Sequence, residues 1–327
     1  MSDAHSLIIV NEDIAQQVVS EAIAYQAVHD IFAAMAKGDA YNFPVIREAI
    51  GYADALYGFK SGFDRAGKSL GVKAGGYWPG NMDKGLTNHQ STVFLFDPDT
   101  GRLTGLVAGN YLTAVRTAAS SAVSIAALSR KNSKIIGMVG AGHQSTFQLR
   151  AAVRQRDFEK VVAWNHHPEM LPRLEAVAKE LGLEFESVTR EELGAQADVI
   201  ITITSAFAPL MEADWIKPGT HIACMGTDTV GKQEVASALV AKATVFTDEV
   251  AQSITLGEAQ HAIKEGLITE SDITSIGKVL NGDHPGRSSD AEITLFDGTG
   301  VGLQDLAVAS VAAKEARKQG LGTLAAL

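Results

Sequence analysis

A glycine turn between an apolar run and a helical pattern is the stretch whose residue types most directly indicate chemistry. Ile135–Val139 predicts a buried strand that ends in Gly140-Ala141-Gly142, and apolar residues recur at helical spacing from Ser145 onward. Strand, glycine turn and helix together expose backbone N–H groups to a pyrophosphate. Gly140 permits the tight turn and Gly142 lets the backbone approach phosphate, whereas Ser145 replaces the third glycine of the fingerprint. A glycine turn without any ligand is the alternative interpretation.

The residues after the next predicted strand bear on which dinucleotide would bind. Folds that select NAD usually present an acidic side chain there, which bonds the ribose hydroxyls. Asn165 stands in that place. Its amide can bond a hydroxyl but does not repel a 2′-phosphate, and no arginine directly follows it. His166 and His167 are expected in a solvated loop.

Composition limits the class of protein. A chain of 327 residues, 46% hydrophobic and 20% charged, predicts a soluble protein of two domains. The net charge of −10 argues against a nucleic-acid or anionic-membrane partner. Cys224 is the only cysteine, so neither a disulfide framework nor a metal site is predicted. With no signal-peptide pattern and no long apolar run, we expect a cytoplasmic protein.

The first 130 residues predict an antiparallel α+β unit. A helix is expected over 13–38 and a second, rich in Ala and Ser, over 113–129. The turn Pro98–Gly101 predicts a hairpin. The extended pieces are 41–49, 55–60, 70–77 and 91–97, with the hairpin strands at 92–96 and 103–107.

From residue 131 strands and helices alternate, which predicts a Rossmann-type, doubly wound parallel sheet of the α/β class. Strands are expected at 134–139, 161–164, 184–188, 198–203, 220–225, 243–247 and 292–296, and helices at 145–154, 168–182, 190–196, 233–241 and 302–318. Residues 250–290 are less regular. We assign 131–300 to dinucleotide binding, and 1–130 with 301–327 to a substrate-binding and dimerisation domain, although the last helix suits either.

Three further segments resemble those of a known protein family. They are Gly71-Val72-Lys73 with Trp78–Asn81, Leu112–Ser120, and Met225–Glu234. With the glycine turn and Ile293–Phe296, the chain resembles the ornithine cyclodeaminase/μ-crystallin family from about residue 40 to 315. The family forms or reduces imines and is commonly dimeric through its first domain.

Within the family, three stretches differ from the common pattern. Most members have Pro-Thr-His near 87–89 and Ser-Val-Gly near 298–300. Here residues 73–81, 85–90 and 296–302 resemble instead the iminosuccinate reductases of the β-hydroxyaspartate cycle. This resemblance implies NADH-dependent reduction of iminosuccinate to L-aspartate in a homodimer. Because Asn165 does not repel a 2′-phosphate, we expect NADP to be tolerated as a cofactor.

The resemblance implies roles for individual residues. Arg47, Lys73 and Arg116 would hold the substrate carboxylate, and Lys73 would also transfer the proton, its pKa lowered by the nearby arginines. Asp228 would stabilise the iminium, and Lys232 would contact the cofactor or pair with Asp228. The full set of expected cofactor contacts is Arg116, Thr117, Gly140, Ala141, Gly142, His143, Gln144, Asn165, Thr202, Thr204, Ser205, Met225, Gly226 and Lys232.

Each role has a structural alternative. Arg116 could form an internal salt bridge, Lys73 could be an exposed charge, and Asp228 could cap a helix. A satisfied polar role is favoured for His89 over substrate contact. A second substrate carboxylate could meet His89, Asn81 or a pair of backbone amides.

The function also has alternatives. One is an ornithine-type cyclodeaminase, which recycles NAD, and another is an alanine dehydrogenase or ketimine reductase. A third is a μ-crystallin-like protein that binds a dinucleotide and a small ligand without turnover.

Overall fold

The computed structural model describes residues 6–326, which divide into two compact units. The first unit runs up to Arg116 and resumes at Val301, and the second is Thr117–Gly300. The boundary between the units after Arg116 falls inside helix α3 (Asn110–Leu128), whereas the sequence predicted a domain boundary after residue 130. That the first unit binds substrate and the second the dinucleotide stays a prediction.

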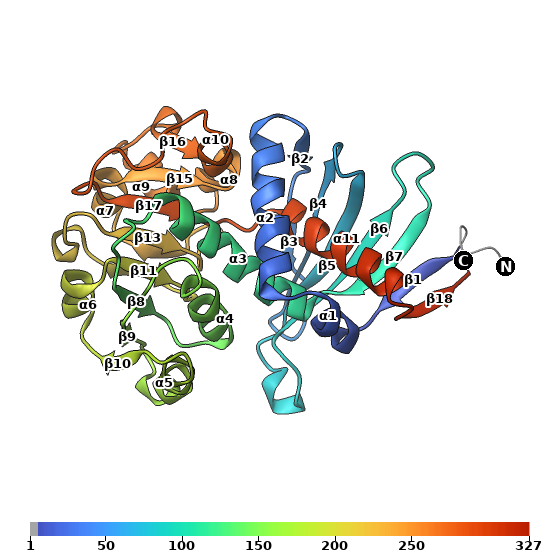
Figure 1. Ribbon diagram of the computed structural model, residues 1–327, viewed down its shortest axis with the longest axis horizontal. Coiled ribbons are helices and arrows are strands. Elements are labelled where there is room, and N and C mark those ends of the chain that lie inside the picture. The colour runs from blue at the N-terminus through green and yellow to red at the C-terminus, as the bar shows by residue number, and fades with distance from the viewer. Residues whose placement is uncertain (1–5, 327) are drawn as a thin grey trace. The chain divides into compact units, whose positions relative to one another are not determined.

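The first unit is a sheet of eight strands in the order β18-β1-β7-β6-β5-β4-β2, with β3 also paired to β4 (Figure 1). Its strands are β1 Leu7–Val10, β2 Ala40–Asn42, β3 Ile46–Ala49, β4 Leu56–Asp64, β5 Ser69–Tyr77, β6 His89–Phe96, β7 Leu103–Ala108 and β18 Thr323–Ala325. Its helices are α1 Glu12–Val18, α2 Glu21–Ala36, the short η2 Met82–Lys84 and α11 Gly302–Lys318. The predicted hairpin is confirmed as β6 and β7.

Helix α11 packs closely on β4 and β5 because two glycines leave room for it. A Cβ on Gly62 would lie 2.9 Å from Leu303 Cγ, and one on Gly71 would lie 2.8 Å from Leu306 Cδ2. The helix also packs against α2. The first turn of α11 is therefore held directly over two strands of the first unit.

The second unit is built on an all-parallel sheet in the order β10-β9-β8-β11-β13-β17-β15-β16, which Figure 1 shows in succession. Its strands are β8 Ile135–Val139, β9 Lys160–Trp164, β10 Glu184–Ser187, β11 Val199–Thr202, β13 His221–Cys224, β15 Thr244–Thr247, β16 Ile273–Ser275 and β17 Thr294–Asp297, with a separate pair β12 Phe207–Met211 and β14 Gln233–Val235. The helices are α4 His143–Ala152, η3 Pro168–Met170, α5 Leu171–Glu180, α6 Arg190–Gln196, η4 Ala213–Trp215, α7 Ser237–Lys242, α8 Val250–Ser253, α9 Gln260–Lys264, η5 Glu270–Asp272 and α10 Ile276–Leu280.

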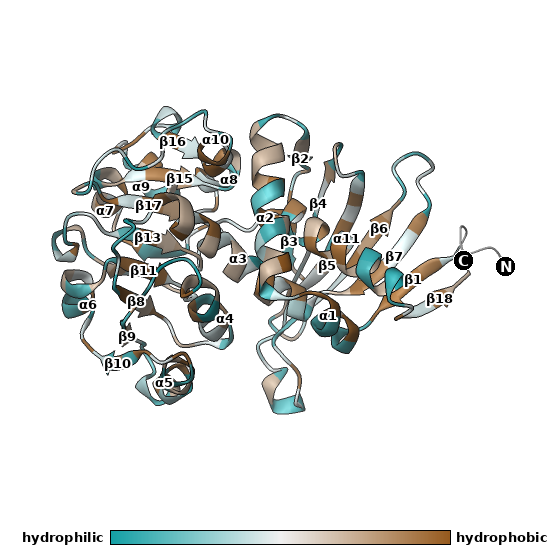
Figure 2. Cartoon of the chain, viewed as in Figure 1, coloured by the Kyte–Doolittle hydropathy of each residue, from teal (hydrophilic) through white to brown (hydrophobic). Residues whose placement is uncertain are grey.

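The chain leaves β8 through β9 and β10 on one side and returns to β11 on the other, so the sheet has a topological switch point between β8 and β11. The predicted doubly wound α/β class is confirmed. Figure 2 shows hydrophobic colours along these strands and hydrophilic segments on α5 and α6. Among residues 6–326, α3 alone has the length and apolarity of a membrane span, but 83% of its apolar window is buried, as in a core helix.

Several local predictions are wrong for identifiable reasons. The helix expected over 13–38 is two helices, because the Ser20 hydroxyl accepts the Ile23 N–H and begins α2 anew. The extended piece 41–49 is two strands separated by Phe43–Val45, which contains a proline. The first unit is also not wholly antiparallel, since β1 runs parallel to β7.

The helix predicted over 233–241 is wrong at its start. Residues Gln233–Val235 form β14, and α7 begins only at Ser237. The Glu258 carboxylate accepts the N–H groups of Glu234 and Val235, which holds this segment extended. Strands β1, β12, β16 and β18 were not predicted, being three to five residues long.

Glycine 71 provides a test of the α11 contact. We expect Gly71→Ala to destabilise the protein by about 1–3 kcal/mol, because its Cβ would meet Phe94 O and Leu306. Gly105→Ala is the matched control in the same sheet, since its Cβ would find only ordinary contacts at 3.5 Å or more. Urea unfolding should show the control to be neutral or stabilised by up to about 1 kcal/mol. Equal stability of the two variants would contradict this packing.

Candidate active site

A buried ion cluster in the first unit joins three segments far apart in the chain. Asp305, in the first turn of α11, accepts hydrogen bonds from Lys73 Nζ at 3.1 Å and Arg116 Nε at 3.0 Å. Lys73 Nζ also donates to Thr113 Oγ1 at 2.7 Å, and Arg116 Nη1 donates to Gln304 Oε1 at 3.1 Å. Lys73 and Arg116 are each 6% exposed and Asp305 is 1% exposed. The exposed-charge alternative for Lys73 is wrong, whereas Arg116 does make an internal salt bridge.

Burial and neighbouring charges shift the pKa values of this cluster. Burial lowers the pKa of Lys73 to about 8, Asp305 opposes this, and Arg116 and Lys60 add to the lowering. The predicted lowering of the Lys73 pKa is confirmed. Its largest cause, however, is burial, and not the nearby positive charges from which the sequence predicted it. Burial alone would raise the pKa of Asp305, yet Arg116 and Lys73 hold it at about 2. The carboxylate therefore stays ionised, and the lysine can exchange a proton near neutral pH.

Strand register places further side chains on the Lys73 face of the sheet. Lys60 lies directly opposite Lys73, and Arg47 lies opposite Gly58, two residues before Lys60. Val93 also pairs with Lys73, so His89, four residues earlier on β6, shares that face. The structure thus gathers four of the predicted residues, Arg47, Lys73, His89 and Arg116, around one sheet face and one helix end.

His89 is neutral in this setting. Burial lowers the pKa of His89 to about 3, and the positive charge of Lys73 adds to the effect. It can act as a neutral hydrogen-bonding group toward a ligand, but not as a cation. Its contact with substrate stays a prediction.

Sequence reasoning missed Lys60, Thr113, Gln304 and Asp305. An acidic residue in the first turn of a helix is ordinary, so Asp305 carried no signal of its own. Strand alternation could have placed Lys60 on the same sheet face as Gly58 and Gly62. Its partner across the sheet, however, depends on a register that the sequence did not specify.

In the second unit, the glycine turn follows β8 at the switch point. Gly140 has a φ of +111°, and a Cβ there would lie 2.6 Å from Ile203 O, so the turn requires glycine. The Ala141 N–H donates to Asn165 Oδ1 at 3.0 Å, and Asn165 Nδ2 donates to His167 O. The amide of Asn165 therefore braces the turn against the loop after β9.

The start of α4 fits a dinucleotide pyrophosphate. Gly142 is its N-cap residue, makes no side-chain cap, and has nothing within 4 Å of the place where a Cβ would stand. Buried Gln144 Oε1 has no hydrogen-bond partner among residues 6–326. Ser145 is 1% exposed and its hydroxyl donates to Gly142 O, which confirms that a serine fits the third glycine position. The helix start thus offers open backbone N–H groups and the space that a phosphate needs.

Buried carboxylates shape the neighbouring strand ends. Glu234, fully buried, accepts from the hydroxyls of Thr202 and Thr204 and from the N–H groups of Thr204 and Gly226. These two threonine hydroxyls are thereby bound to a carboxylate, so any cofactor contact of theirs stays a prediction. Met225 beside them is 7% exposed.

Glu258 stabilises the same loop from a second side. It accepts from the Thr227 hydroxyl and from two N–H groups of β14. Burial, with the nearby charge of Glu234, raises the pKa of Glu258 to about 8. Sequence reasoning missed this residue because its partners lie 23 to 31 residues away in the chain.

Asp228 and Lys232 lie within the loop that these carboxylates organise. Lys232 Nζ donates to Asp228 Oδ1 at 2.8 Å and to Gly226 O at 3.2 Å. The predicted pairing of Lys232 with Asp228 is confirmed. Asp228 does not cap a helix, because a strand and not a helix follows Lys232. The catalytic role of Asp228 stays a prediction.

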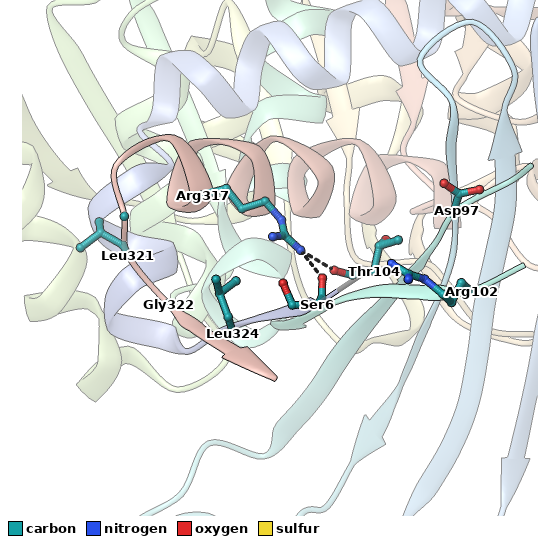
Figure 3. A pocket seen from close by; sticks show the side chains of 9 residues that line it. Ser6, Asp97, Arg102, Thr104, Arg317, Leu321, Gly322 and Leu324 are labelled. Atoms are coloured by element: carbon teal, nitrogen blue, oxygen red, sulfur yellow. Dashed lines mark hydrogen bonds between the residues drawn. The ribbon is translucent and has the colours of Figure 1, made fainter. Parts of the chain in front are cut away.

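A separate cavity of about 590 Å³ lies in the first unit near β1, β7 and β18 (Figure 3). Arg317 lines it and donates to the carbonyls of Ser6 and Thr104, and Leu321 and Leu324 are among the other lining residues. None of the predicted site residues lines it. The described residues also contain no group of three His, Cys, Asp or Glu side chains arranged for a metal ion.

Known proteins match this chain over nearly its whole length. It is 59% identical over 315 residues to iminosuccinate reductase of Paracoccus denitrificans, covering 96% of this chain and 98% of that protein. The crystal structure of the Paracoccus denitrificans enzyme in complex with NAD⁺ superposes with a TM-score of 0.95 at 57% identity, covering 98% and 100% of the two chains. An archaeal alanine dehydrogenase dimer with bound NAD gives a TM-score of 0.92 at 31% identity, covering 98% and 99%.

The model of one family extends across both units. It matches residues 7–320 and so takes in the lysine–aspartate–arginine cluster, the glycine turn and the last helix. The resemblance inferred from the sequence segments is thereby confirmed: this chain belongs to the ornithine cyclodeaminase/mu-crystallin family.

Proposed function

We propose that this chain is an NADH-dependent imine reductase that converts iminosuccinate into L-aspartate. The observation that carries the proposal is the Lys73–Asp305–Arg116 cluster, which combines carboxylate-binding cations with a lysine of lowered pKa. The 59% identity to iminosuccinate reductase supports this choice of substrate. The open helix start at Gly142 supports a dinucleotide cofactor, and the relatives with bound NAD support NAD.

The cluster suits binding and proton transfer together. Among the described residues, Asp305 and Thr113 take two of the three Lys73 ammonium protons, which leaves one to direct at a substrate nitrogen. Arg116 keeps guanidinium N–H groups beyond those bonded to Asp305 and Gln304, so it can bind a carboxylate. When bound, NADH supplies the hydride to the imine carbon. Lys73 supplies the proton to the nitrogen, and Asp305 holds the lysine in place.

Two assignments extend this proposal. Asp228 stabilises the iminium, and Lys232, whose Nζ lies 2.8 Å from Asp228 Oδ1, holds its carboxylate in place. The first unit binds the imino acid and the second binds the dinucleotide. The enzyme works in the cytoplasm, where thiols stay reduced, because its single cysteine, Cys224, is free and buried.

The chain acts as a homodimer through the outer face of the first unit's sheet. Ile46, Tyr57 and Phe59 point away from the Lys73 face, with Ile46 directly opposite Phe59. They are 54%, 37% and 39% exposed. Exposed apolar surface of this kind marks an interaction site, and the archaeal alanine dehydrogenase relative is itself a dimer.

A panel of substrates tests the reaction. We expect NADH oxidation with iminosuccinate, formed from oxaloacetate and ammonium, to exceed that with pyruvate plus ammonium or cyclic ketimines. An ornithine-type cyclodeaminase would show no net NADH oxidation. Because Asn165 does not repel a 2′-phosphate, NADPH should support a lower but measurable rate. No turnover with iminosuccinate, or a large NADPH preference, would overturn the proposal or its cofactor.

The pH dependence tests Lys73. In the reverse direction Lys73 must be deprotonated to accept a proton, so kcat for L-aspartate oxidation should rise with pH through an apparent pKa near 8. Lys73→Met should remove this limb and lower kcat by about 100-fold or more. Lys73→Arg, which keeps the charge without titrating, should lose kcat similarly. If Lys73→Met raises only KM, the lysine is a binding group.

A charged substitution on the outer face of the first unit's sheet tests the dimer interface. Phe59→Glu should halve the mass measured by light scattering at micromolar concentration, because it places a charge in the apolar surface. Leu267→Glu, at a residue 49% exposed in the second unit, is the control and should leave the mass unchanged. A dimer that survives both Phe59→Glu and Ile46→Glu places the interface elsewhere.

A further inference from the structure

Strand β6 carries a hydroxyl that the fold itself does not use. The Oγ atom of Ser91 is buried and has no hydrogen-bond partner in the part of the chain that the structure describes. A serine hydroxyl can donate one hydrogen bond and accept two. Because a buried polar group without a partner costs free energy, such groups are rare in folded proteins. The Ser91 hydroxyl is therefore a candidate for contact with a ligand.

Strand register places this hydroxyl on the face of the sheet that carries Lys73. Val93 is the direct partner of Lys73, and Ser91, two residues earlier on β6, points to the same face. Two residues along a strand span about 6.6 Å, which is comparable to the length of a four-carbon chain. A four-carbon substrate whose nitrogen meets Lys73 can therefore extend one end toward Ser91.

Glycines border the Ser91 side chain in two directions. Gly75 lies directly opposite Ser91 on β5, so no side chain faces it across that strand pair. Gly109 precedes α3, and a Cβ there would lie only 2.5 Å from Ser91 Oγ. Neither neighbour therefore supplies a side chain that covers the hydroxyl or bonds to it.

The backbone of Ser91 is fixed to the start of α3. Its N–H donates to Asn110 Oδ1 at 2.9 Å, and its carbonyl accepts the Gly109 N–H at 2.9 Å. The same helix carries Arg116, which bonds to Asp305. The hydroxyl and the guanidinium are thus attached to one rigid element, which favours binding of a ligand in a defined position.

The other groups considered for a second substrate carboxylate are less suited to bind it. Asn81 Nδ2 donates to Thr87 O, so this amide holds the loop that follows η2. His89 lies two residues before Ser91 on the same face, but burial lowers its pKa to about 3 and keeps it neutral. It can share a carboxylate with Ser91 without contributing a charge.

We propose that the Ser91 hydroxyl donates a hydrogen bond to the second carboxylate of the substrate and so favours dicarboxylic over monocarboxylic imino acids. This rests on the proposed function, which it deepens by naming a residue that sets the substrate class. Arg116 binds the carboxylate beside the imine, and Lys73 acts on the nitrogen. A monocarboxylic substrate leaves the buried hydroxyl without a partner, and a site with an unpaired polar group discriminates against such a substrate.

The kinetic test compares two substrates in Ser91→Ala. We expect kcat/KM for iminosuccinate to fall about 10-fold or more, mainly through KM, because a hydrogen bond to a charged group is lost. With pyruvate plus ammonium, kcat/KM should stay within about 3-fold. Ser91→Cys keeps nearly the same size but offers only a weak donor, so it should behave like Ser91→Ala.

Ser69→Ala is the matched control, because it removes a hydroxyl from the same sheet that is hydrogen-bonded to Ser310 Oγ at 2.6 Å. It should lower the unfolding temperature and leave the ratio of the two substrates unchanged. Ser91→Ala should unfold at the same or a higher temperature, since it removes an unpaired hydroxyl. A lower unfolding temperature for Ser91→Ala, with equal losses for both substrates, would give the hydroxyl a structural role and overturn the proposal.

A binding measurement makes the test independent of turnover. Succinate should inhibit the wild-type enzyme better than propionate, and this preference should shrink about 10-fold in Ser91→Ala and in Ser91→Cys. An unchanged succinate preference in both variants would overturn the role of Ser91. Wild-type enzyme that does not reduce iminosuccinate would instead overturn the proposed function, so the two failures are distinguishable.

Discussion

A single buried carboxylate, that of Asp305, is the group on which the first unit's chemistry depends. It draws the ammonium of β5 and the guanidinium of α3 to the first turn of α11, although these residues are separated by 43 to 232 positions in the chain. A buried ion left without its partner is strongly destabilising, so neither cation can be removed without consequence for the fold. The same carboxylate keeps Lys73 charged enough to bind anions, while burial keeps its pKa low enough to release a proton.

In the second unit, buried carboxylates bind neutral donors, whereas Asp305 in the first unit binds cations. Glu234 and Glu258 have threonine hydroxyls and backbone N–H groups as their partners, and burial raises the pKa of both. Their function is geometric: they hold the ends of β11 and β13 and the extended β14 in one arrangement. A carboxylate can accept several N–H donors at once, which suits it to order a loop that forms no helix.

The first unit's sheet separates chemistry from association by strand alternation. Side chains at Lys60 and Lys73 point to the face covered by α11, and those at Tyr57 and Phe59 point to the other. A shift of one residue in register would exchange the two sets. The glycines that admit α11 therefore also secure the register, because only glycine can face Leu303 and Leu306 at that distance.

The sequence by itself determined what depends on local pattern. Alternating strands and helices specified the parallel sheet, the left-handed φ of Gly140 followed from the glycine turn, and motif resemblance identified Lys73, Arg116 and the family. Tertiary structure alone decided the partners: Asp305 beneath Lys73, Lys60 across from it, and Glu258 holding β14 where a helix was predicted. These contacts join residues distant in the chain, and their energies come from desolvation and register, which exist only once the elements have packed.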